Sequence, residues 1–153
     1  MSRPMFSAIY YIHRMEHETM QICRRLFVVP LANNDHGKST IVRAMVSQGL
    51  GIAVGHHKKA VRDLISPEGR HIDAYVFGRS YQEVEKKDYG SVVNALDAND
   101  EGWRDRELIV MPSHTEETDH GDIVQMIEAA HSAGFDARLE HVAFLTIQDS
   151  HEG

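Results

Sequence analysis

The apolar residues of this chain follow two patterns, one typical of strands and the other typical of helices. The two patterns alternate along the sequence, so it predicts alternating strands and helices. Short apolar runs, typical of strands covered on both faces, occur at Leu26–Val29 and Leu108–Met111. Three further strands are expected at Ile52–Val54, His71–Phe77 and Arg138–Ile147. The pattern therefore favours a domain built from strands and crossover segments.

Helical spacing separates these runs. Ile41, Val42, Met45 and Val46 recur at the interval of one helix face, and Gly49 and Gly51 provide a stop. The same spacing predicts further helices, in chain order, at Ser7–Arg24, Lys58–Ile65, Tyr81–Lys87, Ser91–Ala98 and Ile123–Ala133, the last ended by Gly134.

The last third gives the clearest unit, because strand, helix and strand follow one another there. Such a unit predicts a parallel pair with a right-handed connection. With the unit that starts at Leu26 it predicts a three-layer α/β fold with a mostly parallel central sheet of about five strands. Residues 1–153 are expected to form one domain, with an N-terminal helical extension at about 7–24.

Charge and composition narrow the class of protein. Acidic residues outnumber basic ones, and the net charge of −7 makes nucleic acid an unexpected partner. Cys23 is the only cysteine, which favours a reducing cytoplasm. The apolar stretch near the N-terminus is interrupted by His13, Arg14 and Glu16, so no membrane span is expected.

The segment between the first strand and the following helix suggests a phosphate-binding loop. It runs Ala32-Asn33-Asn34-Asp35-His36-Gly37-Lys38-Ser39. This spelling resembles the Walker A motif of the P-loop NTPase superfamily, in which a strand is followed directly by a phosphate loop and a helix. The resemblance implies a P-loop-type domain.

The resemblance also implies roles for the loop residues. Asn33, Asn34, Asp35 and His36 would form the turn, and the backbone amides from Gly37 to Thr40 would face phosphate oxygens at a helix N-terminus. Lys38 would neutralise the β- and γ-phosphates, and the Ser39 hydroxyl would bind Mg²⁺. Mg²⁺ with ATP or GTP is the implied ligand, with ATP weakly favoured, because the Asp-x-x-Gly and Asn-Lys-x-Asp signatures of GTPases are missing.

Acidic groups beyond the carboxyl ends of the strands are candidates for the catalytic acid. Two polar segments qualify, Gly78–Glu83 and Pro112–Asp119, and within them Glu83, Glu116 and Asp119 are the candidates. We select Glu116 and Asp119, with Lys38, as the catalytic set. Asp73 is expected at the opposite rim. Arg79 is a candidate for stabilising phosphoryl charge, although a surface arginine is the more frequent role.

Three functions remain open at this point. The first is a small Mg²⁺-dependent NTPase, the second a small kinase, and the third a nucleotide sensor or assembly subunit without efficient turnover, with another copy or another protein as partner. The His13-Arg14-Met15-Glu16-His17 spelling matches a zinc peptidase motif, but a chance pattern on a helix explains it better.

Overall fold

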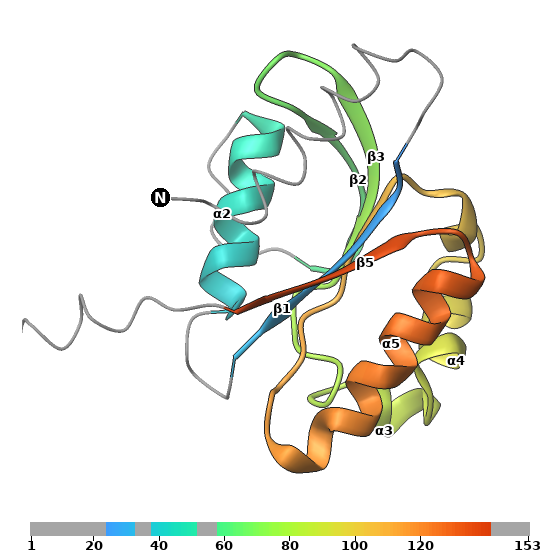
Figure 1. Ribbon diagram of the computed structural model, residues 1–153. Coiled ribbons are helices and arrows are strands. Elements are labelled where there is room, and N and C mark those ends of the chain that lie inside the picture. Colours follow the sequence, from blue (N-terminus) through green and yellow to red (C-terminus); the bar gives the residue numbers. More distant parts are fainter. Residues whose placement is uncertain (1–23, 33–37, 52–57, 142–153) are drawn as a thin grey trace, which may run out of the picture.

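The computed structural model describes residues 24–32, 38–51 and 58–141, with the backbone alone at residues 38–41. Within these residues five strands form one sheet in the order β2-β3-β4-β1-β5 (Figure 1). Four of them are mutually parallel, and only β2 runs antiparallel, to its neighbour β3. The strands are, in chain order, β1 (Leu26–Leu31), β2 (Ala60–Ile65), β3 (His71–Val76), β4 (Leu108–Val110) and β5 (Asp136–His141).

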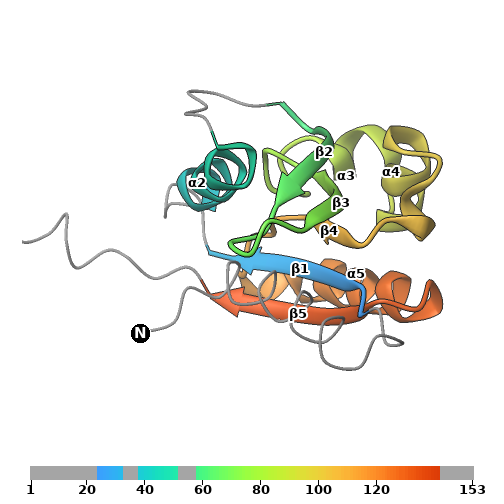
Figure 2. The same cartoon turned by 90° about the horizontal axis from the view of Figure 1, so that it is seen from above.

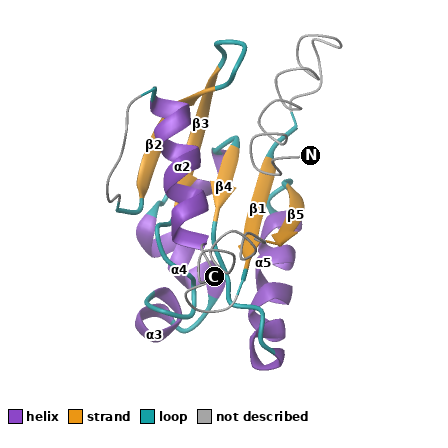
Figure 3. Ribbon diagram, turned by 90° about the vertical axis from the view of Figure 1, so that its left-hand side faces the viewer, coloured by secondary structure: helices purple, strands orange, loops and turns teal. Residues whose placement is uncertain are grey.

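Helices cover both faces of this sheet. Helix α2 (Lys38–Leu50) lies on one face, across β2, β3 and β4 (Figures 1 and 3). Helices α3 (Glu85–Tyr89), α4 (Val92–Asn99) and α5 (His120–Ser132) lie on the other face, as the view from above shows (Figure 2). Two short 3₁₀ turns, η1 (Trp103–Asp105) and η2 (Glu117–Asp119), precede β4 and α5 respectively. The described part of the chain is therefore an α/β arrangement of three layers.

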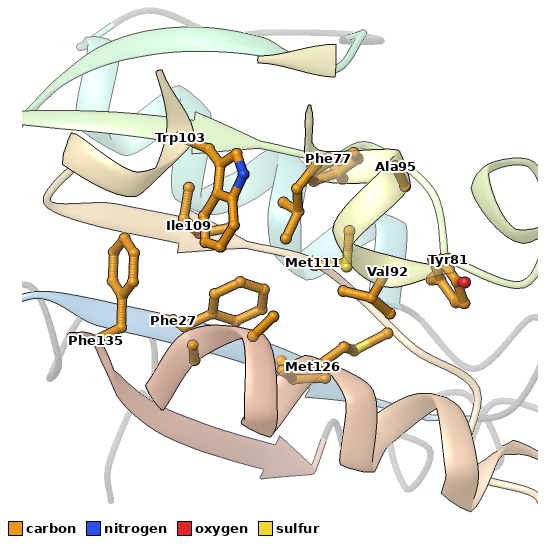
Figure 4. Packing of buried hydrophobic residues seen from close by; sticks show 14 of the residues in the cluster. Phe27, Phe77, Tyr81, Val92, Ala95, Trp103, Ile109, Met111, Met126 and Phe135 are labelled. Atoms are coloured by element: carbon orange, nitrogen blue, oxygen red, sulfur yellow. The ribbon is translucent and has the colours of Figure 1, made fainter. Parts of the chain in front are cut away.

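Each face of the sheet has its own hydrophobic core, and β1 contributes to both. Leu26 and Val28 point toward α2, whereas Phe27 and Val29 point toward the other helical layer. That second core is the larger and is rich in aromatic rings, with Phe27, Trp103 and Phe135 gathered between the sheet and its helices (Figure 4). Residues on both sides of β1 are buried because helices cover both faces, and this explains its continuous apolar run.

Most predicted elements are confirmed, and the glycine stops account for several boundaries. Gly51 and Gly134 follow the ends of α2 and α5 with φ angles of 77° and 86°, a conformation that glycine adopts without strain. Gly49 is different, because it lies inside α2 against Leu64 of β2. The predicted elements at Ser7–Arg24 and Ile52–Val54 lie outside the described residues, apart from Arg24, which is not helical.

The predicted helix over Lys58–Ile65 is wrong, because this segment forms β2. The strand pairs antiparallel with β3 through a tight turn in which the Gly69 amide donates to the Ser66 carbonyl, at 2.8 Å. Pro67 and Gly69 are favoured in such a turn, and Gly69 has a φ of 93°. The apolar and polar residues of this segment fit both a helix and a strand, and its pairing with β3 decides for the strand.

The expected parallel pair in the last third also needs correction. Strands β4 and β5 are parallel and belong to one sheet, but they are not neighbours. Strand β1 lies between them and pairs with both. A strand from the start of the chain is thus inserted into the unit formed by the end of the chain.

Candidate functional site at the ends of β1 and β4

The carboxyl ends of β1 and β4 lie side by side, and the helices that follow these two strands in the sequence lie on opposite faces of the sheet. From β1 the chain continues into α2 on one face, and from β4 it continues into α5 on the other face (Figures 1 and 2). In open α/β sheets such a switch in direction opens a crevice beyond the strand ends, and ligands bind there. The region beyond the carboxyl ends of β1 and β4 is therefore the candidate site.

Backbone hydrogen bonds join the two outgoing segments. The Ser113 amide donates to the Pro30 carbonyl at 2.9 Å, and the Ala32 amide donates to the Ser113 carbonyl at 3.3 Å. Leu31 and Ser113 form a parallel bridge just beyond β4. Ser113 is fully buried. The first residue of the predicted phosphate loop, Ala32, is thus held directly by the segment that follows β4.

The rest of the predicted phosphate loop is described only in part. Asn33, Asn34, Asp35, His36 and Gly37 lie outside the described residues. Lys38, Ser39 and Thr40 form the beginning of α2, and only their backbone is described. The N-terminus of α2 consequently follows the end of β1 after a connection at residues 32–37, and backbone amides at such a terminus favour anions.

A polar network joins the segment after β3 to the segment after β4. The Gln82 amide nitrogen donates to the Ser113 hydroxyl at 2.9 Å and to the Asp122 carboxylate at 3.2 Å, and the Gln82 oxygen accepts from the His114 amide at 2.9 Å. Lys86 of α3 forms an ion pair with Asp122 at 3.0 Å. Asp122 is buried in the first turn of α5, so its charge is compensated by this lysine and by Gln82.

Three buried polar atoms near this edge have no hydrogen-bond partner among the described residues. They are the Ser80 hydroxyl, the Tyr81 hydroxyl and Nε2 of His114. Nε2 of His114 lies 3.6 Å from the Glu83 carboxylate, which is too long for a hydrogen bond but within ion-pair distance when the ring is protonated. Burial, followed by the charges of Asp122 and Glu85, raises the pKa of Tyr81 to about 12, so this hydroxyl stays protonated. Unpaired buried polar atoms are rare in folded proteins, and their occurrence here is consistent with a site that a ligand completes.

The two predicted catalytic acids, Glu116 and Asp119, are bound to one another around η2. The Asp119 carboxylate accepts from the Glu116 amide at 3.1 Å, and the Glu116 side chain accepts from the Asp119 amide. This reciprocal pair is a capping box, which satisfies the free amides at the start of a helical turn. Glu116 is exposed and Asp119 is buried. Both carboxylates therefore have a structural role at the start of η2.

The remaining candidates lie at opposite ends of β3. Glu83 is half-buried and Arg79 is exposed, and both follow β3 on the candidate side. Asp73 lies at the amino end of β3, where its carboxylate accepts from Arg106 at 3.1 Å, as expected for the opposite rim. Within residues 24–32, 38–51 and 58–141 no three His, Cys, Asp or Glu side chains are grouped to hold a metal ion. No helix in these ranges is long and apolar enough to cross a membrane.

Lys86 and Asp122 were not predicted as site residues. The rule about strand ends pointed to the segments after β3 and β4, which contain Gln82 and Ser113, but neither α3 nor the body of α5. Nothing in the spacing indicates that Asp122 faces Gln82, because their contact depends on how α5 packs beside α3. Comparison of the chain with protein-family models, curated proteins and solved structures finds no match.

Proposed function

We propose that this chain is a small cytoplasmic P-loop protein that binds a purine nucleoside triphosphate with Mg²⁺ and hydrolyses it. The observation that supports this proposal is the position of the Walker A-like motif at residues 32–39. Residues 32–37 join the end of β1 to the start of α2 at the switch point of the sheet, where a phosphate group would meet the amides of a helix N-terminus.

In this proposal the residues of the loop perform the chemistry of phosphate binding. The amides from Gly37 to Thr40 bind phosphate oxygens, Lys38 neutralises the β- and γ-phosphates, and Ser39 binds the Mg²⁺ ion. The ion supplies further charge neutralisation when it is bound. A carboxylate after β4, Glu116 or Asp119, orients the attacking water.

Nucleotide titration tests the proposal. ATP and GTP, each with Mg²⁺, are titrated against the wild type, Lys38→Ala and the control Lys87→Ala, in which an exposed lysine of α3 is removed. We expect Lys38→Ala to weaken binding at least tenfold and Lys87→Ala to bind as the wild type does. Equal weak binding by the wild type and Lys38→Ala would refute the proposal.

A second candidate function is a nucleotide sensor or assembly subunit that does not turn the nucleotide over efficiently. It is favoured by the residues that directly follow β3 and β4, Phe77-Gly78-Arg79 and Met111-Pro112-Ser113, which include no carboxylate. Tight binding without phosphate release, together with a nucleotide-dependent change in light scattering, would support this function. Phosphate release would support the NTPase, and transfer only to an added acceptor would indicate a kinase.

Glu116→Gln separates the structural role of that residue from a catalytic one. The amide oxygen of glutamine still accepts the hydrogen bond that caps η2, but the charge is gone. If Glu116 orients water, phosphate release falls at least tenfold while the nucleotide dissociation constant and the urea midpoint stay unchanged. Unchanged phosphate release would remove Glu116 from the catalytic set.

A further inference from the structure

One amide side chain, that of Gln82, joins three segments near the candidate site: the segments after β3 and β4, and the start of α5. It contacts Ser113 and His114 after β4, and Asp122 at the start of α5. We propose that Gln82 is a positioning residue, which holds the segment after β4 where the phosphate loop needs it. This inference rests on the proposed nucleotide site.

The hydrogen bonds of Gln82 fix its orientation. Its two amide hydrogens are directed to the Ser113 hydroxyl and the Asp122 carboxylate, and its oxygen accepts from the backbone amide of His114. An ionised carboxylate only accepts and a backbone N–H only donates. A flipped Gln82 amide would therefore place its oxygen against the Asp122 carboxylate and its NH₂ group against the His114 N–H. Glutamine is thus suited to this position by both its shape and its polarity.

Ser113 connects Gln82 to the loop. Its hydroxyl accepts from Gln82, while its backbone bonds to Pro30 and Ala32 at the end of β1. Gln82 is therefore separated from the first residue of the proposed phosphate loop by a single residue. On its other side, Gln82 is anchored by Asp122, which the Lys86 ammonium holds at 3.0 Å.

Replacing this amide by a carboxylate removes its donor at nearly constant size. In Gln82→Glu the new carboxylate lies against that of Asp122 and loses the donor to Ser113. Two carboxylates at hydrogen-bond distance do not both ionise readily, so one of them binds a proton with a raised pKa. That shared proton restores a hydrogen bond between them, and lowering the pH therefore repairs the contact with Asp122 but not the one with Ser113.

The test compares nucleotide affinities at two pH values. Mg²⁺ with ATP, or with GTP if the wild type prefers it, is titrated at pH 8 and pH 6 against the wild type, Gln82→Glu, Gln82→Met and the double variant Gln82→Glu/Asp122→Asn. Gln125→Glu is the matched control, because Gln125 of α5 accepts from the Val92 amide through its side-chain oxygen, which a carboxylate also provides. Urea unfolding of each variant reports whether it folds.

We expect Gln82→Glu to bind about tenfold more weakly than the wild type at pH 8 and to recover part of that loss at pH 6, because the shared proton restores the contact with Asp122 but not the donor to Ser113. The double variant should regain part of the lost affinity at both pH values, since an amide at position 122 again faces a carboxylate at position 82, while the donor to Ser113 stays missing. Gln82→Met should bind weakly at both, and Gln125→Glu should match the wild type.

The outcomes separate this inference from the proposed function. If the wild type binds nucleotide but Gln82→Glu binds as tightly at pH 8, the positioning role is wrong. It is also wrong if a folded Gln82→Glu loses affinity without recovery at pH 6 and without rescue by Asp122→Asn, because the loss would then be general damage. Equal weak binding by the wild type and Lys38→Ala overturns the nucleotide site itself, and the inference with it.

Discussion

Arg25 joins three segments near the amino ends of the strands, on the side of the sheet opposite the candidate site. Its guanidinium donates to the Arg104 carbonyl at 2.6 Å and to the Ala133 carbonyl at 2.5 Å, and it lies 4.4 Å from the centre of the Phe135 ring. Arg25 comes just before β1, so these contacts fix the start of that strand to η1 and to the end of α5. We predict that Arg25→Met destabilises the protein substantially.

The magnitude follows from the contacts that methionine cannot make. A hydrogen bond to a charged group contributes about 1.5–3 kcal/mol, and the residue is half-buried, so we take the lower value for each of the two bonds. Methionine retains an apolar stem over Phe135, and the loss of the cation–π contact adds about 0.5 kcal/mol. The sum is about 3.5 kcal/mol, or a Tm lowered by roughly 7–14 °C for a chain of this length.

Urea unfolding at neutral pH, without nucleotide, measures this loss. Arg25→Lys should lie between the wild type and Arg25→Met, because an ammonium keeps the charge but cannot span both carbonyls as the guanidinium does. Arg138→Met is the matched control, since it removes an exposed arginine that pairs with Glu140, and it should cost about 0.5 kcal/mol or less.

Two results would refute the reasoning about Arg25. In the first, Arg25→Met and Arg138→Met have the same free energy of unfolding. In the second, Arg25→Lys is as stable as the wild type, which would show that the fork of two hydrogen bonds contributes nothing beyond charge. Nucleotide affinity should be the same in all folded variants, because these contacts lie away from the ends of β1 and β4.

Three further predictions concern packing and ionisation. Gly49→Ala should destabilise the protein by about 1 kcal/mol in urea unfolding, because its new methyl would lie 2.9 Å from Leu64 and overpacking outweighs the gain in helix propensity; a more stable variant would contradict this. Burial first, and then neighbouring acidic groups, raises the pKa of Tyr75 to about 12, as it does for Tyr81, so an ultraviolet titration of the folded protein should show both ionising well above pH 10. The unfolded chain ionises these tyrosines near pH 10, so stability should fall as the pH rises from about 10 to 12, and a flat alkaline limb would be evidence against it. Hydrogen bonds from an indole and then a guanidinium lower the pKa of Asp97, so its contribution to stability is present above about pH 4 and is lost as the pH falls further; Asp97→Asn should flatten the acid limb of the unfolding curve, and an unchanged limb would contradict this.

The strands and helices of the described chain were largely predictable because most of them have one dominant pattern. The Leu108–Val110 run is apolar on both faces, and α5 ends at a glycine with positive φ. Strand β2 was predicted wrongly because Arg62 and Asp63 interrupt its apolar alternation. Its identity depends on pairing with β3, a contact that local spacing does not encode.

The candidate site was predictable only to the level of segments. The spelling of residues 32–39 and the rule about strand ends indicated where to look. The order of the strands decides which segments meet, and that order came from the insertion of β1 between β4 and β5. The contact between Gln82 and Asp122 depends on this order and on the packing of α5, so no periodicity could reveal it.

Pro30 changes the hydrogen bonding at the end of β1. It lies inside a central strand, where proline is rarely found, and its carbonyl accepts from Ser113 while its ring nitrogen has no hydrogen to donate. In an extended strand both groups of one residue face the same neighbour, so the ladder between β1 and β4 is interrupted at this residue. Beyond the interruption, the two backbone bonds of Ser113 hold the strand end. On the other side of β1 the pairing with β5 continues through Pro30 to Leu31 and His141, so the end of β1 is held more completely by β5 than by β4.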